Sequence, residues 1–196
     1  MAEIKSTMEM VLARAALMDS GPAPDLAAEE LVKEGMRLGA AYLRREFDDL
    51  GKRLEARPPV EQPGLLQGVV KTMLRNIFLP RTNEYDSLEP AIKGLLDLSK
   101  GGGDLLPVFS EIKSIISRYV EHRNQLRKQL EGAFAKQVQQ MQDNMARQTG
   151  MAMKIDPAHH PKFQEEWQRI QVELNNQYGR VLDQHKQLIE QRLTGQ

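Results

Sequence analysis

The sequence contains no cysteine among its 196 residues, which excludes disulfide bonds, thiolate catalysis and cysteine-ligated zinc. Aromatic residues make up only 5% of the chain, and no segment approaches the ~18 uninterrupted apolar residues of a membrane-spanning helix. The opening MAEIKSTMEM carries acidic residues and lacks the basic flank and apolar run of a secretory signal. We therefore expect a cytoplasmic protein without a membrane span.

The chain also has no net charge, because 27 basic residues balance 27 acidic residues. Proteins that follow a phosphate backbone usually show a basic face or a pI above about 9. The triple glycine at residues 101–103 is not followed by the Gly-Lys-Ser/Thr ending of a phosphate-binding loop. The sequence therefore predicts no nucleic-acid partner and no cofactor.

The dominant pattern is helical, because apolar residues recur at steps of three and four while alternation with a period of two is absent. We predict an all-α fold, an elongated helical bundle with a long C-terminal antiparallel helical hairpin. Residues 1–103 form an N-terminal helical region with prolines and glycines between its helices. In the second of these helices, Gly35 and Gly39 lie one turn apart and permit close helix contact. The predicted helices of this region cover about residues 6–18, 25–56, 64–79 and 87–99.

Residues 104–196 change in character, since 15 of the 17 glutamines fall there and the helical period is nearly unbroken. Two long helices, about residues 104–148 and 161–194, carry apolar seams and should form an antiparallel hairpin. A tight connection would place Phe134 opposite Leu174 and Leu130 opposite Tyr178. About 30 paired residues would make a rod of ~45 Å. Because two helices bury only one side each, either helix 25–56 or a second copy of the chain should cover the rod, and we expect a homodimer.

The same pairing would place Arg123 opposite His185 as a polar layer in the apolar seam. One interpretation is a polar pair that fixes the register of the hairpin. The other, which we favour, is that both side chains extend along the helix surface to reach water.

The segment IDPAHHP, residues 155–161, connects the two long helices and holds two of the four histidines. His159 and His160 are candidate metal ligands, with Asp156 or Glu165 as further ligands. The alternative is structural: Asp156 before Pro157 starts a turn, Pro161 suits a first helical position, and His160 lies at the N-cap. We favour the turn, because the histidines lack the fixed helical spacing of known metal motifs.

A cluster of methionines and aromatic residues surrounds this connection. Methionine adapts to irregular partners, so the cluster is a candidate surface for binding another protein. The alternative is that these side chains fill the end of the hairpin core or a contact between two copies. The residues are Met141, Met145, Met151, Met153, Phe163 and Trp167.

The opening EIKSTMEMVLARAALM, residues 3–18, resembles the start of a family of uncharacterised bacterial helical proteins whose members begin with an EIKST-like segment. The resemblance implies a helical bacterial protein. It implies no activity, cofactor or catalytic residue.

No local motif supplies a nucleophile with its base or a pair of carboxylates suited to acid–base catalysis. We therefore expect a non-catalytic protein-interaction or scaffold protein. One alternative is a self-associating structural dimer. The other is an enzymatic or metal-binding bundle, which would need a concave pocket with convergent histidine, aspartate or glutamate side chains.

Overall fold

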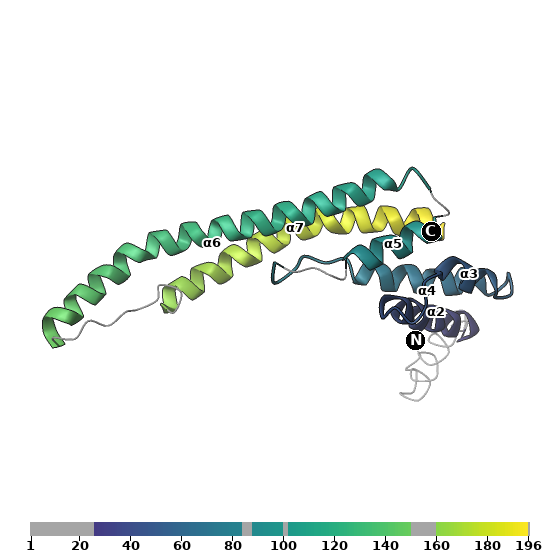
Figure 1. Cartoon of the computed structure of the whole chain (residues 1–196), viewed down its shortest axis with the longest axis horizontal. Helices are drawn as coiled ribbons and strands as arrows, with labels where there is room; N and C mark the ends of the chain where they lie inside the picture. Colours follow the sequence, from purple (N-terminus) through teal and green to yellow (C-terminus); the bar gives the residue numbers. More distant parts are fainter. Residues whose placement is uncertain (1–25, 84–87, 100–101, 150–159, 196) are drawn as a thin grey trace, which may run out of the picture.

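The computed structural model describes residues 26–83, 88–99, 102–149 and 160–195, and every regular element in these ranges is a helix (Figure 1). The chain is all-α, as the apolar periodicity predicted. The long helices α6 (Leu106–Thr149) and α7 (Pro161–Thr194) run side by side as a hairpin. None of the described helices combines the length and apolar character needed to cross a membrane. The helix predicted over residues 6–18 lies outside the described residues.

Four shorter helices gather at one end of the hairpin and are called the head here (Figure 1). Their bounds are α2 (Leu26–Leu43), α3 (Leu50–Glu55), α4 (Gln62–Arg75) and α5 (Leu88–Leu98). Helix α4 ends before the predicted residue 79, because Asn76 caps it and its side-chain amide donates to the Thr72 carbonyl at 2.9 Å.

The prediction of one helix over residues 25–56 is wrong, since the chain turns between α2 and α3. Arg45 adopts a left-handed backbone with φ of 61°, and the amide of Glu46 donates to the carbonyl of Ala41 at 3.1 Å. These features define a helix C-terminal cap that usually contains glycine. Asp49 then caps α3, because its Oδ1 accepts from the amide of Lys52 at 2.9 Å. The turn brings α3 back against α4 and α5, where Leu50 becomes fully buried.

Helices α2 and α4 pack in parallel and approach so closely that glycine is required at their crossing. A Cβ added to Gly35 would overlap the carbonyl oxygen of Leu65, and one added to Gly68 would overlap that of Val32. The hydroxyl of Thr72 also donates to the carbonyl of Met36 at 3.3 Å. The close contact predicted from the small residues of α2 is therefore present.

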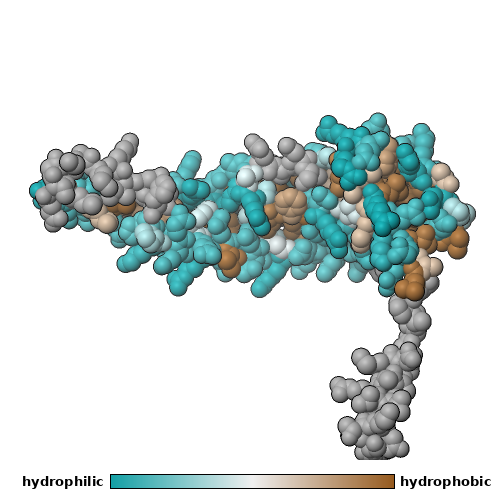
Figure 2. Space-filling view, turned by 90° about the horizontal axis from the view of Figure 1, so that it is seen from below, coloured by the Kyte–Doolittle hydropathy of each residue, from teal (hydrophilic) through white to brown (hydrophobic). Residues whose placement is uncertain are grey.

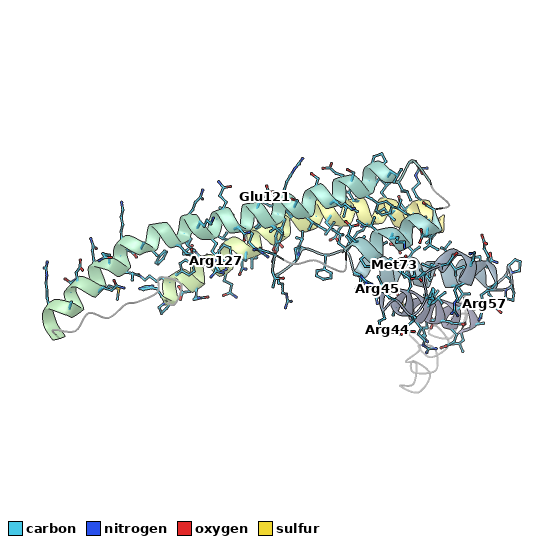
Figure 3. The ribbon with its side chains drawn as sticks, viewed as in Figure 1. Arg44, Arg45, Arg57, Met73, Glu121 and Arg127 are labelled. Carbon is cyan, nitrogen blue, oxygen red and sulfur yellow. The ribbon has the colours of Figure 1, made fainter. Side chains whose placement is uncertain are left out.

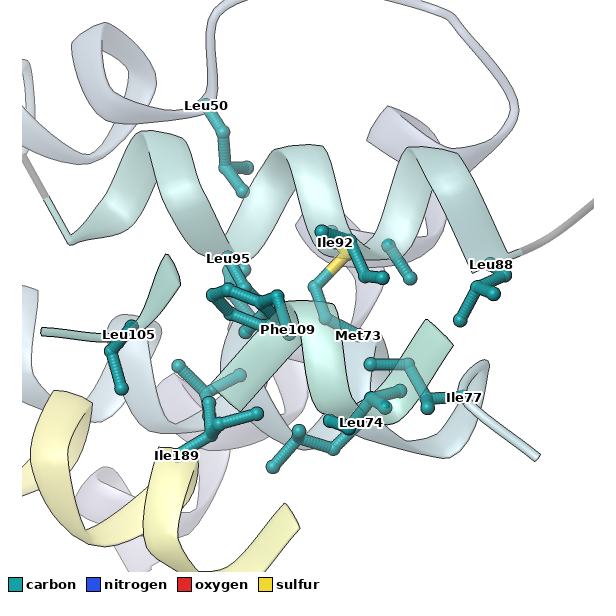
Figure 4. Packing of buried hydrophobic residues seen from close by; sticks show 14 of the residues in the cluster. Leu50, Met73, Leu74, Ile77, Leu88, Ile92, Leu95, Leu105, Phe109 and Ile189 are labelled. Atoms are coloured by element: carbon teal, nitrogen blue, oxygen red, sulfur yellow. The ribbon is translucent and has the colours of Figure 1, made fainter. Parts of the chain in front are cut away.

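One buried apolar cluster joins the head to the base of the hairpin (Figure 4). Helix α4 contributes many residues to this cluster, with Val69, Val70 and Met73 fully buried. The hairpin contributes Phe109 and Ile189, which pack near Leu74 and Leu95 of the head (Figure 4). The third surface that covers the hairpin at its base is thus formed by the head. One prediction placed the second helix along the hairpin. Helix α2 instead packs on α4.

The bounds of the two hairpin helices match the predicted ones within two residues, but their predicted register is wrong. Phe134 packs edge-on against Phe163 with ring centroids 5.7 Å apart, and Tyr119 packs against Tyr178 at 5.6 Å. Tyr178 therefore faces a position about three helical turns from Leu130. Near the base, Arg192 lies 3.9 Å from Asp104 in the same register. Helix α6 consequently extends beyond the start of α7 (Figure 1).

Candidate functional site

Two of the predicted tip residues, Phe163 and Trp167, are buried in the hairpin. Phe163 is only 1% exposed and Trp167 only 9%, because both pack against α6 within the hairpin seam. Arg127, which lies midway along the hairpin (Figure 3), places its guanidinium 5.9 Å from the Trp167 ring centre. Met141 is 46% exposed. The side chain of Met145 and the whole of Met151 and Met153 lie outside the described residues, so a partner-binding role for the tip stays a prediction.

His160 occupies the N-cap of α7, as the turn interpretation predicted. Its Nδ1 accepts from the amide of Lys162 at 3.3 Å, and Pro161 begins the helix. The His160 ring lies 5.7 Å from that of Phe134. His159 lies outside the described residues. Within the described ranges, no group of three histidine, aspartate or glutamate side chains is placed to hold a metal ion.

Arg123 is buried, with 6% exposure, but neither interpretation of its polar layer is correct. Its guanidinium donates to the Pro80 carbonyl at 2.6 Å and to Asn83 Oδ1 at 2.7 Å, both in the segment that follows α4. His185 instead has Nδ1 2.8 Å from the Val181 carbonyl of its own helix. Arg123 therefore ties the head segment to the hairpin and does not pair the two hairpin helices.

Polar contacts across the seam lie close to Arg123. The hydroxyl of Tyr119 donates to Asn175 Oδ1 at 2.8 Å, and the hydroxyl of Tyr178 lies 3.4 Å from Nδ1 of His122. Each of these polar side chains has a partner within the hairpin. The arrangement stabilises the register and supplies no unpaired group suited to bind a ligand.

A groove on the head combines an apolar lining with polar groups at its edge. It has a volume of about 440 Å³ and is bounded by α3, α4, α5 and the C-terminal end of α7. This volume falls within the range of protein ligand sites. We call it the head groove, and its apolar lining consists of Leu54, Pro59, Pro63, Leu66 and Leu98.

The local sequence explains how the head groove forms. Pro58 and Pro59 interrupt the chain after α3, and the amide of Glu61 donates to the Pro58 carbonyl at 2.9 Å in a tight turn. Pro63 occupies the first turn of α4, where a missing amide hydrogen has little cost. The turn connects α3 to α4, and residues of both helices line the groove together with the end of α5.

The polar residues of the head groove include two acids, Glu55 and Asp97. The carboxylate of Asp97 accepts from the Tyr42 hydroxyl at 3.3 Å. Burial of the Tyr42 ring, followed by the nearby Asp97 charge, raises the pKa of its hydroxyl to about 12. Tyr42 therefore remains a neutral donor at physiological pH.

Sequence reasoning did not identify the head groove. The sequence features that could have indicated it are the prolines at 58, 59 and 63 and the apolar residues at the ends of α3 and α5. These residues are far apart in the chain, and only the packing of four helices brings them together.

No curated protein and no solved structure matches this chain. A family model matches residues 51–191, which include α4 to α6, α7 as far as Gln191 and the lining of the head groove except Thr194, but not the EIKST-like opening segment. Because the match covers most of the chain, the protein belongs to this family of unknown function (DUF6657).

Proposed function

We propose that the protein is a non-catalytic scaffold that binds another protein through the head groove. The observation that carries this proposal is the open apolar lining of the groove, in which Pro59 and Pro63 are exposed while Leu66 and Leu98 are partly buried. Apolar surface that remains accessible on a folded head favours association with a partner.

An exposed apolar side chain beside the groove supports the head as the binding end. Val60 is the neighbour of Pro59 and is 84% exposed. The hairpin face in Figure 2 is mostly hydrophilic, whereas hydrophobic residues gather over the head. The head groove is therefore a better candidate than the tip, where Phe163 and Trp167 are buried.

The hairpin suits the role of a spacer in such a scaffold. Helix α7 has 34 residues, which corresponds to a length of ~51 Å at 1.5 Å per residue. Its base is fixed in the core of the head through Leu182 and Ile189. A partner bound at the head would then be held at a defined distance from anything that contacts the far end of the hairpin.

A photo-crosslinking experiment tests the docking site. Benzoylphenylalanine placed at Pro59 should yield an adduct with a defined polypeptide in cells, because this residue borders the groove. The matched control places it at Ala133, an exposed residue of α6. The partner is identified by mass spectrometry and its affinity for the purified chain is measured by calorimetry. The same adducts from both positions, or no binding by the identified partner, would contradict the proposal.

Self-association is the second candidate function, and a specific feature of α7 favours it. Val181 and Leu188 lie two turns apart on one face of α7, and each is 41% exposed. Light scattering coupled to size-exclusion chromatography should show a dimer that a Val181→Ser, Leu188→Ser variant weakens. A monomer at all concentrations would remove this candidate.

We also infer a cytoplasmic location in a bacterium. The absence of cysteine fits a reducing compartment, and the resemblance of residues 3–18 supports the bacterial origin. Fractionation of the native cells tests the location, and recovery from a secreted or membrane fraction would contradict it.

A further inference from the structure

We propose that the head groove binds a segment of a protein partner in which lysine or arginine lies next to aliphatic side chains. This inference rests on the proposed function and specifies the chemistry of the partner. It follows from the combination of an apolar lining with a concentration of negative charge.

Three helices end at the head groove. Helix α3 ends at Glu55, α5 at Leu98 and α7 at Thr194, and all three residues line the groove. The C-terminal end of a helix carries a partial negative charge, because its last carbonyl groups point outward along the axis. Convergence of three such ends favours a cation in the groove.

Carboxylates add full negative charges to these partial ones. Glu55 and Asp97 line the head groove, and both side chains are exposed at its edge. The N-terminal end of α4 opposes this effect with a partial positive charge, and Glu61, which precedes its first turn, forms an ion pair with Arg57 at 2.9 Å. The described residues that line the groove include the acids Glu55 and Asp97 and no lysine, arginine or histidine, so the lining itself is negative.

A neighbouring hollow extends the negative surface. It shares Gly51 and Asp97 with the head groove and adds Asp48 and Asp49. Lys93 also lines it, and Lys52 forms an ion pair with Asp49 at 3.1 Å, so these two lysines offset part of the charge. Asp48 continues the acidic edge beyond the groove.

The lining determines what must accompany the cation. Leu66 and Leu98 form an apolar surface that would bury aliphatic side chains of the partner away from water. A basic residue beside those side chains would approach the carboxylates at the edge. An acidic partner would meet like charge and be rejected.

Two peptides test the inference with the full chain. One is an amphipathic, fluorescein-labelled peptide of leucine and lysine at helical spacing, and the other has glutamate in place of every lysine. Fluorescence anisotropy at low ionic strength should show at least about 10-fold tighter binding of the lysine peptide, and added salt should reduce the difference. Amide shifts in NMR spectra should map to the groove around Leu66 and Leu98.

Charge variants provide the matched comparison. Asp97→Asn combined with Glu55→Gln removes both carboxylates, while an asparagine oxygen can still accept from Tyr42. We expect the lysine peptide to bind about 5-fold or more weakly to this variant. The control, Asp143→Asn with Glu111→Gln, changes two exposed acids of α6 and should alter binding less than about 2-fold.

Equal binding of the two peptides at the groove would overturn the inference about charge, while the groove would remain a binding site. Binding of the lysine peptide away from the groove, or equal weakening by both pairs of substitutions, would also overturn it. Failure of the proposed function is measured separately, by the crosslinks from Pro59, which do not depend on the charge of the partner.

Discussion

At the scale of single residues, two glycines decide how closely α2 and α4 approach. Gly35 and Gly68 face the backbone of the opposite helix, so any side chain there would displace a main-chain carbonyl group. A backbone neighbour cannot move aside as a flexible side chain can. The contact therefore depends on the absence of a Cβ.

We predict that Gly68→Ala lowers the free energy of unfolding by about 2–3 kcal/mol, since overpacking outweighs the gain of up to about 1 kcal/mol in helix propensity. Urea denaturation monitored by circular dichroism measures the change. Gly132→Ala is the control, because a Cβ at this position in α6 would meet nothing within 4 Å. It should raise stability by up to about 1 kcal/mol. Equal stabilisation by both substitutions would contradict the close helix contact.

Tyr42 gives the head a pH dependence in the alkaline range. Its pKa of about 12 in the folded protein lies above the value near 10 expected for an unfolded chain. Between these values the folded state retains a proton that the unfolded state has lost, so stability falls as pH rises through this window. Below about pH 10 this contribution is fully present.

We expect the free energy of unfolding of the native chain to fall by about 2 kcal/mol more than that of Tyr42→Phe between about pH 10 and about pH 12. Urea unfolding of both chains across this range measures the difference in the free energy of unfolding. The titration of other groups is common to both chains and cancels in this difference. Parallel curves for the two chains would show that the Tyr42 pKa is not raised.

At the scale of elements, Arg123 joins the hairpin to the segment that leads from α4 toward α5. Its guanidinium donates hydrogen bonds to the Pro80 carbonyl and to Asn83 Oδ1, and it lies 5.6 Å from the Tyr119 ring centre. Hydrogen bonds from a charged donor contribute more than neutral ones, and removal of the donor leaves a buried carbonyl unsatisfied.

Arg123→Met should therefore destabilise the protein by about 2–3 kcal/mol, measured by chemical denaturation. It should also accelerate hydrogen exchange in residues 77–83, because this segment loses its contact with α6. Arg118→Met changes an exposed arginine of the same helix and should alter stability by less than about 0.5 kcal/mol. If both variants match the native chain, the Arg123 contacts do not stabilise the junction.

The register of α6 against α7 also belongs to this scale. The predicted and observed registers differ by close to three full helical turns, so the two alignments present the same face of α6 to α7. The same apolar stripe therefore faces α7 in either register. Specific contacts such as Tyr119 with Asn175 and Phe134 with Phe163 distinguish the two alignments, and periodicity alone does not.

At the scale of the whole molecule, the hairpin makes the protein elongated (Figure 1). Helix α6 alone has 44 residues, or ~66 Å. A compact chain of 196 residues would have a radius of gyration of about 16 Å. Small-angle X-ray scattering should give a value above about 20 Å for the monomer, and a value near 16 Å would mean that the hairpin folds back on the head.

The sequence by itself determined where most helices lie, because apolar spacing and helix caps act over a few residues. It located α6 and α7 within two residues of their ends and placed His160 at the N-cap of α7. It did not locate the break at Arg45, since the apolar stripe continues through Phe47 and Leu50 without the glycine or proline that usually marks such a turn.

The tertiary structure decided the hairpin register, the partners of Arg123, the burial of Phe163 and Trp167, and the head groove. Each depends on contacts between residues far apart in the chain, and several arrangements satisfy the same local pattern. The groove illustrates this most clearly, because the ends of α3, α5 and α7 meet the start of α4 only after the core has packed.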